Sequence, residues 1–259
     1  MSGRGERSCV RLPRLGARLY DRLGQTRATG MQVRQIARYL VSRIPRGRLL
    51  DIGTGPGHLL REVHRLNPKL QLCGLDVSGA MVRLARRNLQ GIRADLREGT
   101  IRRTTYPSDT FALVTCTGSL YLWDDPRACL EEVFRILEGG HSAYLFETHR
   151  GLQRDELQRA LGANLRGESL LSRLLSRRFL KQQLRMTYPR QELDAILQRS
   201  PFADSYWINE VTLAGLPIWL RITLTKPRHP APTDGRPTAP PAQRLVPGRA
   251  RRPASATVR

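Results

Sequence analysis

LLDIGTGPG, residues 49–57, is the stretch that decides the fold. An apolar run suited to a buried strand leads into Gly53, Gly55 and Gly57, which let the backbone turn tightly with no Cβ in the way. The next residues, HLLREVHRL (58–66), have the apolar spacing of a helix. A helix that begins at such a turn directs its free N–H groups and the positive end of its dipole toward the loop. The stretch therefore predicts a strand, a ligand-binding glycine loop and a helix.

A second apolar run, LCGLD (72–76), ends on Asp76, nineteen residues after Gly57. An acidic side chain at the carboxyl end of the second strand can accept both hydroxyls of a ribose. The spacing of the glycines further restricts the class of ligand. A dinucleotide fingerprint needs a third glycine at position 58, which is His58 here, and a P-loop needs Gly-Lys-Ser/Thr after the glycines. The pattern predicts an adenosine-containing cofactor other than a dinucleotide.

Strand-like and helix-like segments alternate through the middle of the chain. Apolar residues at helical spacing occur at 31–44, 58–66, 78–89 (with Ser78 as N-cap) and 126–137, the last closing on Gly139-Gly140. Apolar runs that indicate strands occur at 48–52, 72–76, 110–117 and 142–149. Such regular alternation implies βαβ units, and hence a parallel sheet covered by helices on both faces.

The pattern changes after a helical stretch at 153–199. Residues 204–215 and 216–226 are two β-rich runs joined at Ala214-Gly215. Two such runs with a short glycine-containing connection indicate a hairpin. We expect this hairpin to add an antiparallel edge to the parallel sheet.

Asp51 followed by GxGxG resembles motif I of the class I S-adenosylmethionine (SAM)-dependent methyltransferases. Further segments resemble that family in the same order along the chain. Gly74–Met81 looks like its GxDxSxxM segment, and Pro107–Val114 is similar to PFxDxSFDxV. Leu120–Pro126 resembles the hhWxDP element of the type-11 branch, which includes quinone-biosynthesis C-methyltransferases, and Arg135–Gly140 resembles RxLKPGG.

The resemblance covers about residues 15–226 and implies a fold and a cofactor. The implied fold is an α/β, Rossmann-like, seven-stranded, mostly parallel sheet with helices on both faces and an antiparallel C-terminal hairpin. The implied cofactor is SAM. The implied cofactor-binding residues are Asp51, Gly53, Thr54, Gly55, Gly57, Asp76, Val77, Met81, Asp95, Leu96, Thr117 and Gly118.

The same resemblance implies roles for these residues. The three glycines make room for the methionine part of SAM, and Asp51 helps to hold its ammonium group. Asp76 takes the ribose hydroxyls, while Val77 and Met81 enclose the adenine ring, with ordinary core packing as the alternative. Asp95 and Leu96 are expected where the third strand meets the adenine amine. Thr117 and Gly118 are expected beside the sulfonium.

Methyl transfer from a sulfonium needs mainly the alignment of the reacting atoms. A general base is needed only if the acceptor must lose a proton. The candidates are His149 after the fifth strand, Asp124 after the fourth, and Tyr20, which matches an N-terminal lid motif of the type-11 branch. For His149 and Asp124, a surface or capping role is the alternative. No metal site is expected, because the four cysteines lack metal-ligand spacing and indicate buried free thiols.

The residues at the end of the fourth strand narrow the class of acceptor. Thr115-Cys116-Thr117-Gly118 stands where nucleobase amino-methylating enzymes carry [DNS]PP[YFW]. Cys116 also lacks the preceding proline that is common in cytosine C5-methyltransferases. We therefore expect a small-molecule acceptor. Leucines among cations at 153–190 suggest amphipathic helices over an apolar, anionic or lipid-like acceptor, or else helices that simply pack on the sheet.

The net charge is +22, and 41 of the 44 basic residues are Arg. This excess indicates either a polyanionic partner or the codon usage of a GC-rich genome. The alternative function is therefore a basic RNA-binding or anionic-membrane-binding protein that keeps a SAM-binding fold, with an RNA methyltransferase between the two. The oligomeric state cannot be predicted from the sequence.

The ends of the chain have a different composition from its middle. We expect 1–14 to be a disordered basic N-terminus, 15–226 to be the methyltransferase domain with a substrate-side helical insertion at 153–199, and 227–259 to be a disordered Pro/Arg-rich tail. No apolar h-region and no run of about 18 apolar residues is present, so cytoplasm is the expected location.

Overall fold

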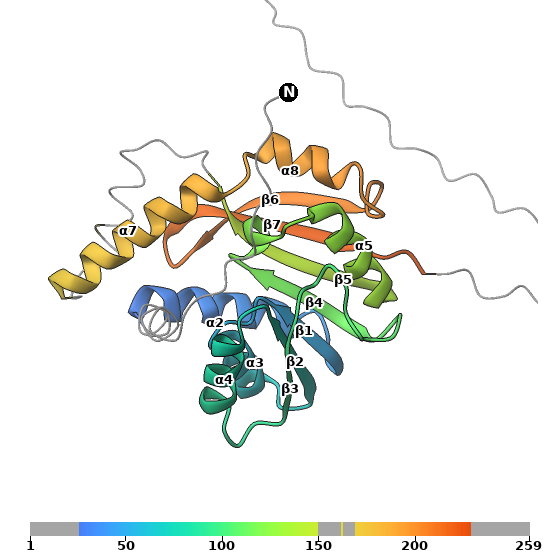
Figure 1. Cartoon of the computed structure of the whole chain (residues 1–259), viewed down its shortest axis with the longest axis horizontal. Helices are drawn as coiled ribbons and strands as arrows, with labels where there is room; N and C mark the ends of the chain where they lie inside the picture. Colours follow the sequence, from blue (N-terminus) through green and yellow to red (C-terminus); the bar gives the residue numbers. More distant parts are fainter. Residues whose placement is uncertain (1–25, 150–161, 163–168, 229–259) are drawn as a thin grey trace, which may run out of the picture. The chain divides into compact units, whose positions relative to one another are not determined.

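Seven strands form one sheet in this computed structural model, which describes residues 26–149, 162 and 169–228 (Figure 1). The strands are β1 (Gly47–Ile52), β2 (Leu70–Asp76), β3 (Ala94–Glu98), β4 (Phe111–Thr117), β5 (Leu137–Thr148), β6 (Tyr206–Leu213) and β7 (Leu216–Thr225). Their order is β3-β2-β1-β4-β5-β7-β6. The first five pair in parallel, and β7 runs antiparallel to both β5 and β6. The expected fold class is confirmed.

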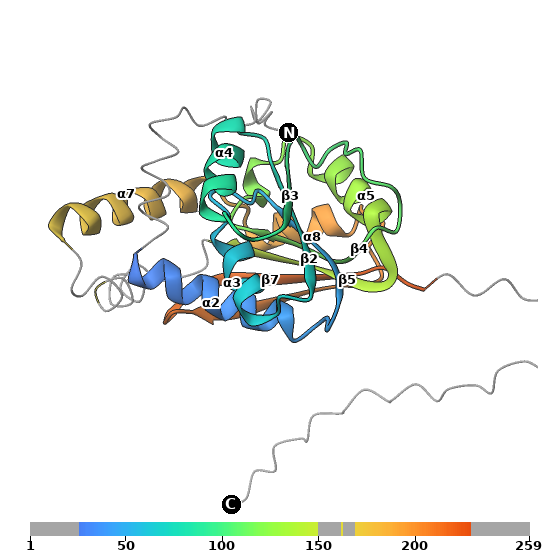
Figure 2. The same ribbon diagram turned by 90° about the horizontal axis from the view of Figure 1, so that it is seen from below.

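Helices cover both faces of this sheet (Figure 2). They are α2 (Arg27–Val41), α3 (His58–Leu66), α4 (Gly79–Asn88), the 3₁₀ turn η1 (Leu120–Leu122), α5 (Pro126–Ile136), α7 (Leu170–Met186) and α8 (Arg190–Leu197). Buried side chains of α5 and α8 contribute to a first core cluster, and those of α2, α3 and α4 contribute to a second core cluster. The two clusters lie on opposite faces, as expected for a doubly covered parallel sheet.

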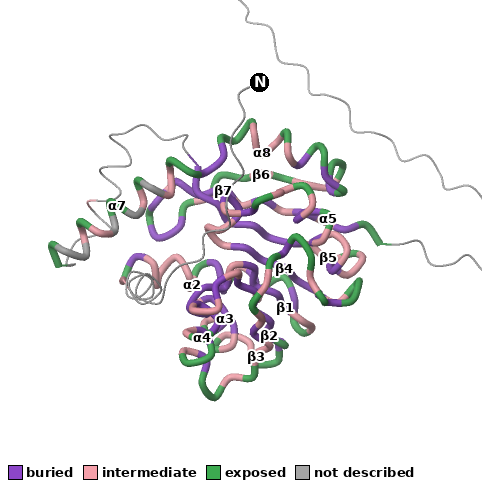
Figure 3. Tube along the Cα trace, viewed as in Figure 1, coloured by how far each residue is buried: buried purple, intermediate pink, exposed green. Residues whose placement is uncertain are grey.

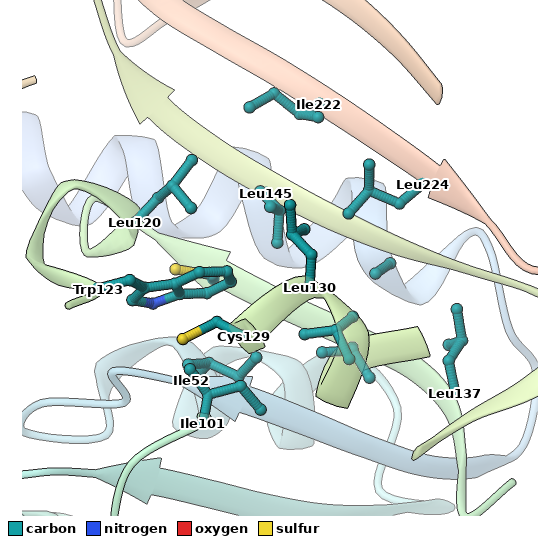
Figure 4. Close-up of a cluster of buried hydrophobic side chains, with 14 of the residues drawn as sticks. Ile52, Ile101, Leu120, Trp123, Cys129, Leu130, Leu137, Leu145, Ile222 and Leu224 are labelled. Carbon is teal, nitrogen blue, oxygen red and sulfur yellow. The ribbon is translucent and has the colours of Figure 1, made fainter. Parts of the chain in front are cut away.

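The first core cluster joins η1 and α5 to the strands below them (Figure 4). Trp123 and Leu130 pack there with Leu145 of β5, and all three are buried. The second cluster includes Leu40 of α2 and Leu60 of α3, both fully buried. Figure 3 shows the central strands as the most continuously buried part of the chain. Side chains of β1 belong to both clusters, so packing on both faces of the sheet holds the end of β1 from which the glycine loop begins.

Among the described helices, α2 and α5 begin at side chains that cap the first turn. Asp125 caps α5 by accepting a hydrogen bond from the N–H of Ala128 at 3.1 Å, and Pro126 occupies the first position of the helix. Ser78 occupies the N-cap position of α4, but its side chain makes no capping hydrogen bond. The glycines at 139 and 140 lie inside β5 instead of closing α5, because the strand already starts at Leu137 opposite Phe111.

The closing hairpin turns at Ala214 and Gly215, with φ of 50° and 74°. Two successive positive φ values match the twist of a tight hairpin turn. β7 then runs between β5 and β6 and ends beside Lys226, a buried residue. The Lys226 Nζ donates to Asp109 Oδ1 at 2.8 Å and to the Leu137 carbonyl at 2.9 Å. The end of the hairpin is therefore tied to the start of β5.

Several expectations concern residues outside the described part of the chain. Tyr20, Cys9, the N-terminal segment 1–14 and all but two residues of 227–259 lie outside it, so the predicted domain boundaries stay predictions. Cys73, Cys116 and Cys129 are free and buried, as expected. Within the described residues, no helix is long and apolar enough to cross a membrane.

Candidate functional site

The glycine loop after β1 is fixed to its neighbours by backbone hydrogen bonds. The N–H groups of Gly53 and Thr54 both donate to the Leu75 carbonyl, at 2.8 and 3.1 Å. The Asn88 Nδ2 of α4 donates to the Pro56 carbonyl at 3.0 Å. The loop is thus held against the carboxyl end of β2 and the end of α4, where the sequence predicts a ligand site.

All three glycines of the loop have positive φ, of 69°, 53° and 81° at positions 53, 55 and 57. Side chains rarely adopt this conformation. A Cβ on Gly53 would also overlap the Ser119 side chain, and one on Gly57 would lie 3.1 Å from Leu89 Cδ1. Gly53 and Gly57 are therefore required by neighbouring protein atoms. Their expected role in clearing space for the cofactor stays a prediction.

Asp51 is a buried acid at the carboxyl end of β1, with 3% of its surface exposed. Burial raises its pKa to about 7, and the nearby Asp76 carboxylate acts in the same direction. Among the described residues, no cation forms an ion pair with Asp51. The site therefore has a buried carboxyl group that a ligand cation would stabilise in its charged form.

Asp76, the last residue of β2, connects the loop to α4. Its Oδ2 accepts from the Gly55 N–H at 2.8 Å, and its Oδ1 accepts from the Ser78 N–H at 2.9 Å. Burial nevertheless raises its pKa above the ordinary value. A carboxylate offers about four lone-pair sites, so each oxygen can still accept another donor. The position and the remaining acceptor capacity suit the hydroxyls of a ribose.

The other expected contacts lie at the same edge. Val77 is half-buried, and Met81 is buried but belongs to neither core cluster. Gly118 follows β4 with φ of 61° and donates its N–H to the Phe146 carbonyl at 2.7 Å. The Thr117 Oγ1 is buried and has no hydrogen-bond partner among the described residues. Because buried hydroxyls are usually paired, Thr117 fits a site that a polar ligand completes.

The register of β3 places Asp95 and Leu96 in the body of that strand, and their expected contact with the adenine stays a prediction. They pair with Cys73 and Gly74 in the body of the strand, while Glu98 stands opposite Asp76. The Asp95 carboxylate forms an ion pair with Arg97 at 2.8 Å, and Leu96 is buried in the second core cluster. The strand runs three residues beyond Asp95, so this acid does not reach the carboxyl edge.

Two of the three catalytic candidates can be located. His149 follows β5 and is buried, and its backbone N–H donates to the Ile218 carbonyl at 3.0 Å. Burial lowers the pKa of His149, so its ring is neutral at pH 7. Asp124 pairs with the Arg102 guanidinium at 3.3 Å on the surface. Tyr20 lies outside the described residues.

Sequence reasoning missed Glu147, a fully buried acid of β5. Its Oε2 accepts from the Tyr121 N–H of η1 at 3.3 Å, and its Oε1 accepts from the Thr148 N–H at 3.0 Å. Burial raises its pKa to about 7. The available signal was a carboxyl group inside the apolar run SAYLFETH. Glu147 fixes the turn that comes after β4.

Ser119 was also missed. Its Oγ donates to the Ile52 carbonyl at 3.2 Å and lies 2.9 Å from Cys116 Sγ. The same side chain occupies the space beside Gly53. Ser119 therefore joins the turn after β4 to the glycine loop after β1. No pattern in the sequence identifies it, because the contact spans strands that are adjacent only in the folded sheet.

Comparison with known proteins agrees with this geometry. The sequence model of a family described as "Methyltransferase domain" matches residues 49–140. A ubiquinone/menaquinone biosynthesis C-methyltransferase, UbiE, of Desulfotalea psychrophila is 30% identical over 102 residues, which is 39% of this chain and 42% of that protein. A demethylmenaquinone methyltransferase of Deinococcus radiodurans is 30% identical over 133 residues, 49% of this chain and 55% of that protein. The chain spans about half the length of the curated relatives it matches.

A solved structure shares the fold. It is a protein of Methanococcus maripaludis described as a SAM-dependent methyltransferase, with 20% identity and a TM-score of 0.65. The match covers 89% of this chain and 99% of that one. By its sheet order and this match, the chain has the fold of that methyltransferase, and its residues 49–140 match the methyltransferase-domain family.

Proposed function

We propose that this chain binds SAM at the glycine loop and transfers a methyl group to a small, partly apolar acceptor. The observation that carries the proposal is the position of two buried acids, Asp51 and Asp76, on either side of that loop. A buried acid is costly unless it is paired, so both side chains suit a ligand that brings positive charge and hydroxyl donors.

In this proposal Asp51 holds the ammonium group of the cofactor, and Asp76 holds its ribose hydroxyls. Met81 and Val77 border the adenine, and the unpartnered Thr117 hydroxyl lies nearest the reacting end. When bound, SAM supplies an electrophilic methyl carbon. The protein then contributes mainly alignment, and the hydrogen bonds of Ser119 and Glu147 hold the turn after β4 in one position.

For an acceptor that must lose a proton, His149 is the base we favour. Its buried ring is neutral near pH 7 and can accept a proton. Asp124 already pairs with Arg102 and is the weaker candidate. A His149→Asn variant with unchanged cofactor affinity and a large loss of turnover would support this role.

The acceptor class rests on two observations. The two named relatives have titles that concern quinone methylation. In addition, α7 places Gln183 beside the turn at Gly118 and packs Leu180 against the second core cluster. A ring with an apolar tail suits such a lining, and a hydroquinone with an alkyl tail is the first acceptor to test.

Calorimetry on the full chain tests the proposal directly. Titration with SAM should release or absorb heat, while NADH should give no signal. Asp76→Ala should weaken SAM binding at least about tenfold, because a hydrogen bond to a charged acceptor contributes about 1.5–3 kcal/mol. Thermal melts check that the variant is folded. A signal with NADH alone, or unchanged SAM affinity in the folded variant, would overturn the cofactor assignment.

A further inference from the structure

α7 has an unusual composition for a helix on a protein surface. Its 17 residues, LLSRLLSRRFLKQQLRM, include Arg173, Arg177, Arg178, Lys181 and Arg185, and none is acidic. Surface helices usually mix charges of both signs, since pairs three or four residues apart stabilise the helix. The charge of α7 therefore has no counterpart within the helix itself.

Six exposed residues of α7 lie on one side of the helix, which we call the outer face. At about 3.6 residues per turn, spacings of three and four bring them into line. All are exposed, and Leu170 and Leu174 are 82% and 66% exposed, the largest values among the described apolar side chains. The outer face consists of Leu170, Leu174, Arg177, Arg178, Lys181 and Arg185.

The opposite side of α7 is already occupied. Leu180 packs against the second core cluster. The Gln183 Nε2 is so close to the turn after β4 that a Cβ on Gly118 would lie 3.1 Å from it. In both ribbon views the start of α7 extends beyond the sheet (Figure 1, Figure 2). These contacts prevent the helix from rotating to bury its two exposed leucines.

The combination of leucines and cations indicates which kind of partner the outer face binds. Cations alone would suit any polyanion, including RNA. Large exposed apolar side chains beside them gain nothing from a phosphate backbone in water, but they do gain from insertion among acyl chains. Anionic headgroups attract Arg and Lys at the same depth. A helix with this pattern lies in the plane of a membrane surface and does not cross it.

We infer that the outer face of α7 binds the surface of a bilayer that contains anionic lipids. Leu170 and Leu174 enter the acyl boundary, and Arg177, Arg178 and Lys181 contact the headgroup phosphates. The opposite side of the same helix borders Gly118, so a membrane-resident acceptor would reach the turn after β4 directly from the lipid. The binding itself does not depend on methyl transfer.

Vesicle co-sedimentation of the full chain tests the inference. Vesicles of phosphatidylcholine with phosphatidylglycerol should bind the protein, and vesicles of phosphatidylcholine alone should bind it much less. Replacing Leu170 and Leu174 together by Gln should lower the partition coefficient at least about tenfold with no change in net charge. Both side chains are exposed, so thermal melts of this variant should match those of the unchanged protein.

A matched pair of charge variants locates the contact. Arg177→Gln, Arg178→Gln and Lys181→Gln together remove three cations from the outer face. Arg249→Gln, Arg251→Gln and Arg252→Gln remove three from the C-terminal segment. The first set should reduce vesicle binding at least about tenfold, and the second should reduce it by less than about threefold.

Two results would overturn the inference. One is unchanged vesicle binding after both leucines are replaced, since the contact would then be electrostatic only. The other is an equal loss of binding in the two charge variants, since the affinity would then depend on total charge. Salt-sensitive retention on heparin that is the same with and without the leucines, together with unchanged vesicle binding, would assign the face to a polyanion such as RNA.

Discussion

Asp51 combines full burial with a position next to the glycine loop, so its charge state should control the cofactor affinity. Its pKa of about 7 means that the protonated form predominates below neutral pH. If the bound cofactor requires the carboxylate, binding in acid includes the cost of ionising the group and should strengthen as pH rises. We expect the dissociation constant for SAM to fall by more than about tenfold between pH 5.5 and 7.5.

The matched variant for this prediction is Asp51→Asn, measured by calorimetry at both pH values. It should bind SAM weakly and with little pH dependence, because the titrating group is gone. A wild-type affinity that is constant over this range would contradict the role of Asp51.

Glu147 has a role that depends on both carboxylate oxygens, because each accepts a backbone N–H. In Glu147→Gln one oxygen becomes an NH₂ group, and either Tyr121 or Thr148 then faces another donor. A buried donor left unsatisfied costs about 1–3 kcal/mol, so we expect the free energy of unfolding in urea to fall by that amount. Glu138→Gln, at a half-buried position near the start of β5, is the control and should change it by less than about 0.5 kcal/mol. Equal losses in both variants would contradict this account.

At the scale of elements, the glycine loop and the turn after β4 are packed as one unit through Gly53 and Ser119. Gly53→Ala adds both a positive-φ strain and an overlap with Ser119. Gly91→Ala is the control, since Gly91 has φ of 83° with nothing within 4 Å of the added Cβ. We expect Gly53→Ala to be the more destabilising in urea unfolding.

A second substitution isolates the overlap. Ser119→Gly in the Gly53→Ala background should recover part of the loss, with a coupling of about 0.5–3 kcal/mol in the double-mutant cycle. Strictly additive effects would show that the two elements do not constrain each other.

The sequence predicts the elements of this fold better than the contacts between them. HLLREVHRL has apolar residues at helical spacing and lies between Gly57 and Asn67-Pro68, which favour the start and the end of a helix. The observed helix α3 spans the predicted residues, 58–66. The position of Asp95 and Leu96 within β3 could not be predicted, because the short run around them does not show where the strand ends. The register with β2, which sets that end, is a long-range property. Glu147 and Ser119 were missed for the same reason, since their partners lie in other elements.

At the scale of the whole molecule, Lys226 is the last buried residue of the part of the chain that the structure describes. Its buried ammonium holds Asp109 and the Leu137 carbonyl. Lys226→Met keeps the apolar stem but leaves that carbonyl without its donor, so we expect a loss of about 1–3 kcal/mol in the free energy of unfolding. A chain that ends at Arg228, the last of the described residues, should unfold within about 0.5 kcal/mol of the full chain. A larger loss on truncation than in Lys226→Met would contradict this boundary.

The insertion of β7 between β5 and β6 has a consequence for biosynthesis. When the residues up to the end of β5 have left the ribosome, the glycine loop, Asp51, Asp76 and the five parallel strands have all been synthesised. The backbone N–H and C=O groups of β5 that pair with residues 219–225 are still unpaired at this point. They stay unpaired until some seventy more residues have been translated. An open apolar edge invites pairing with other nascent chains. The last strand to be made is thus the one that protects the growing polypeptide from aggregation.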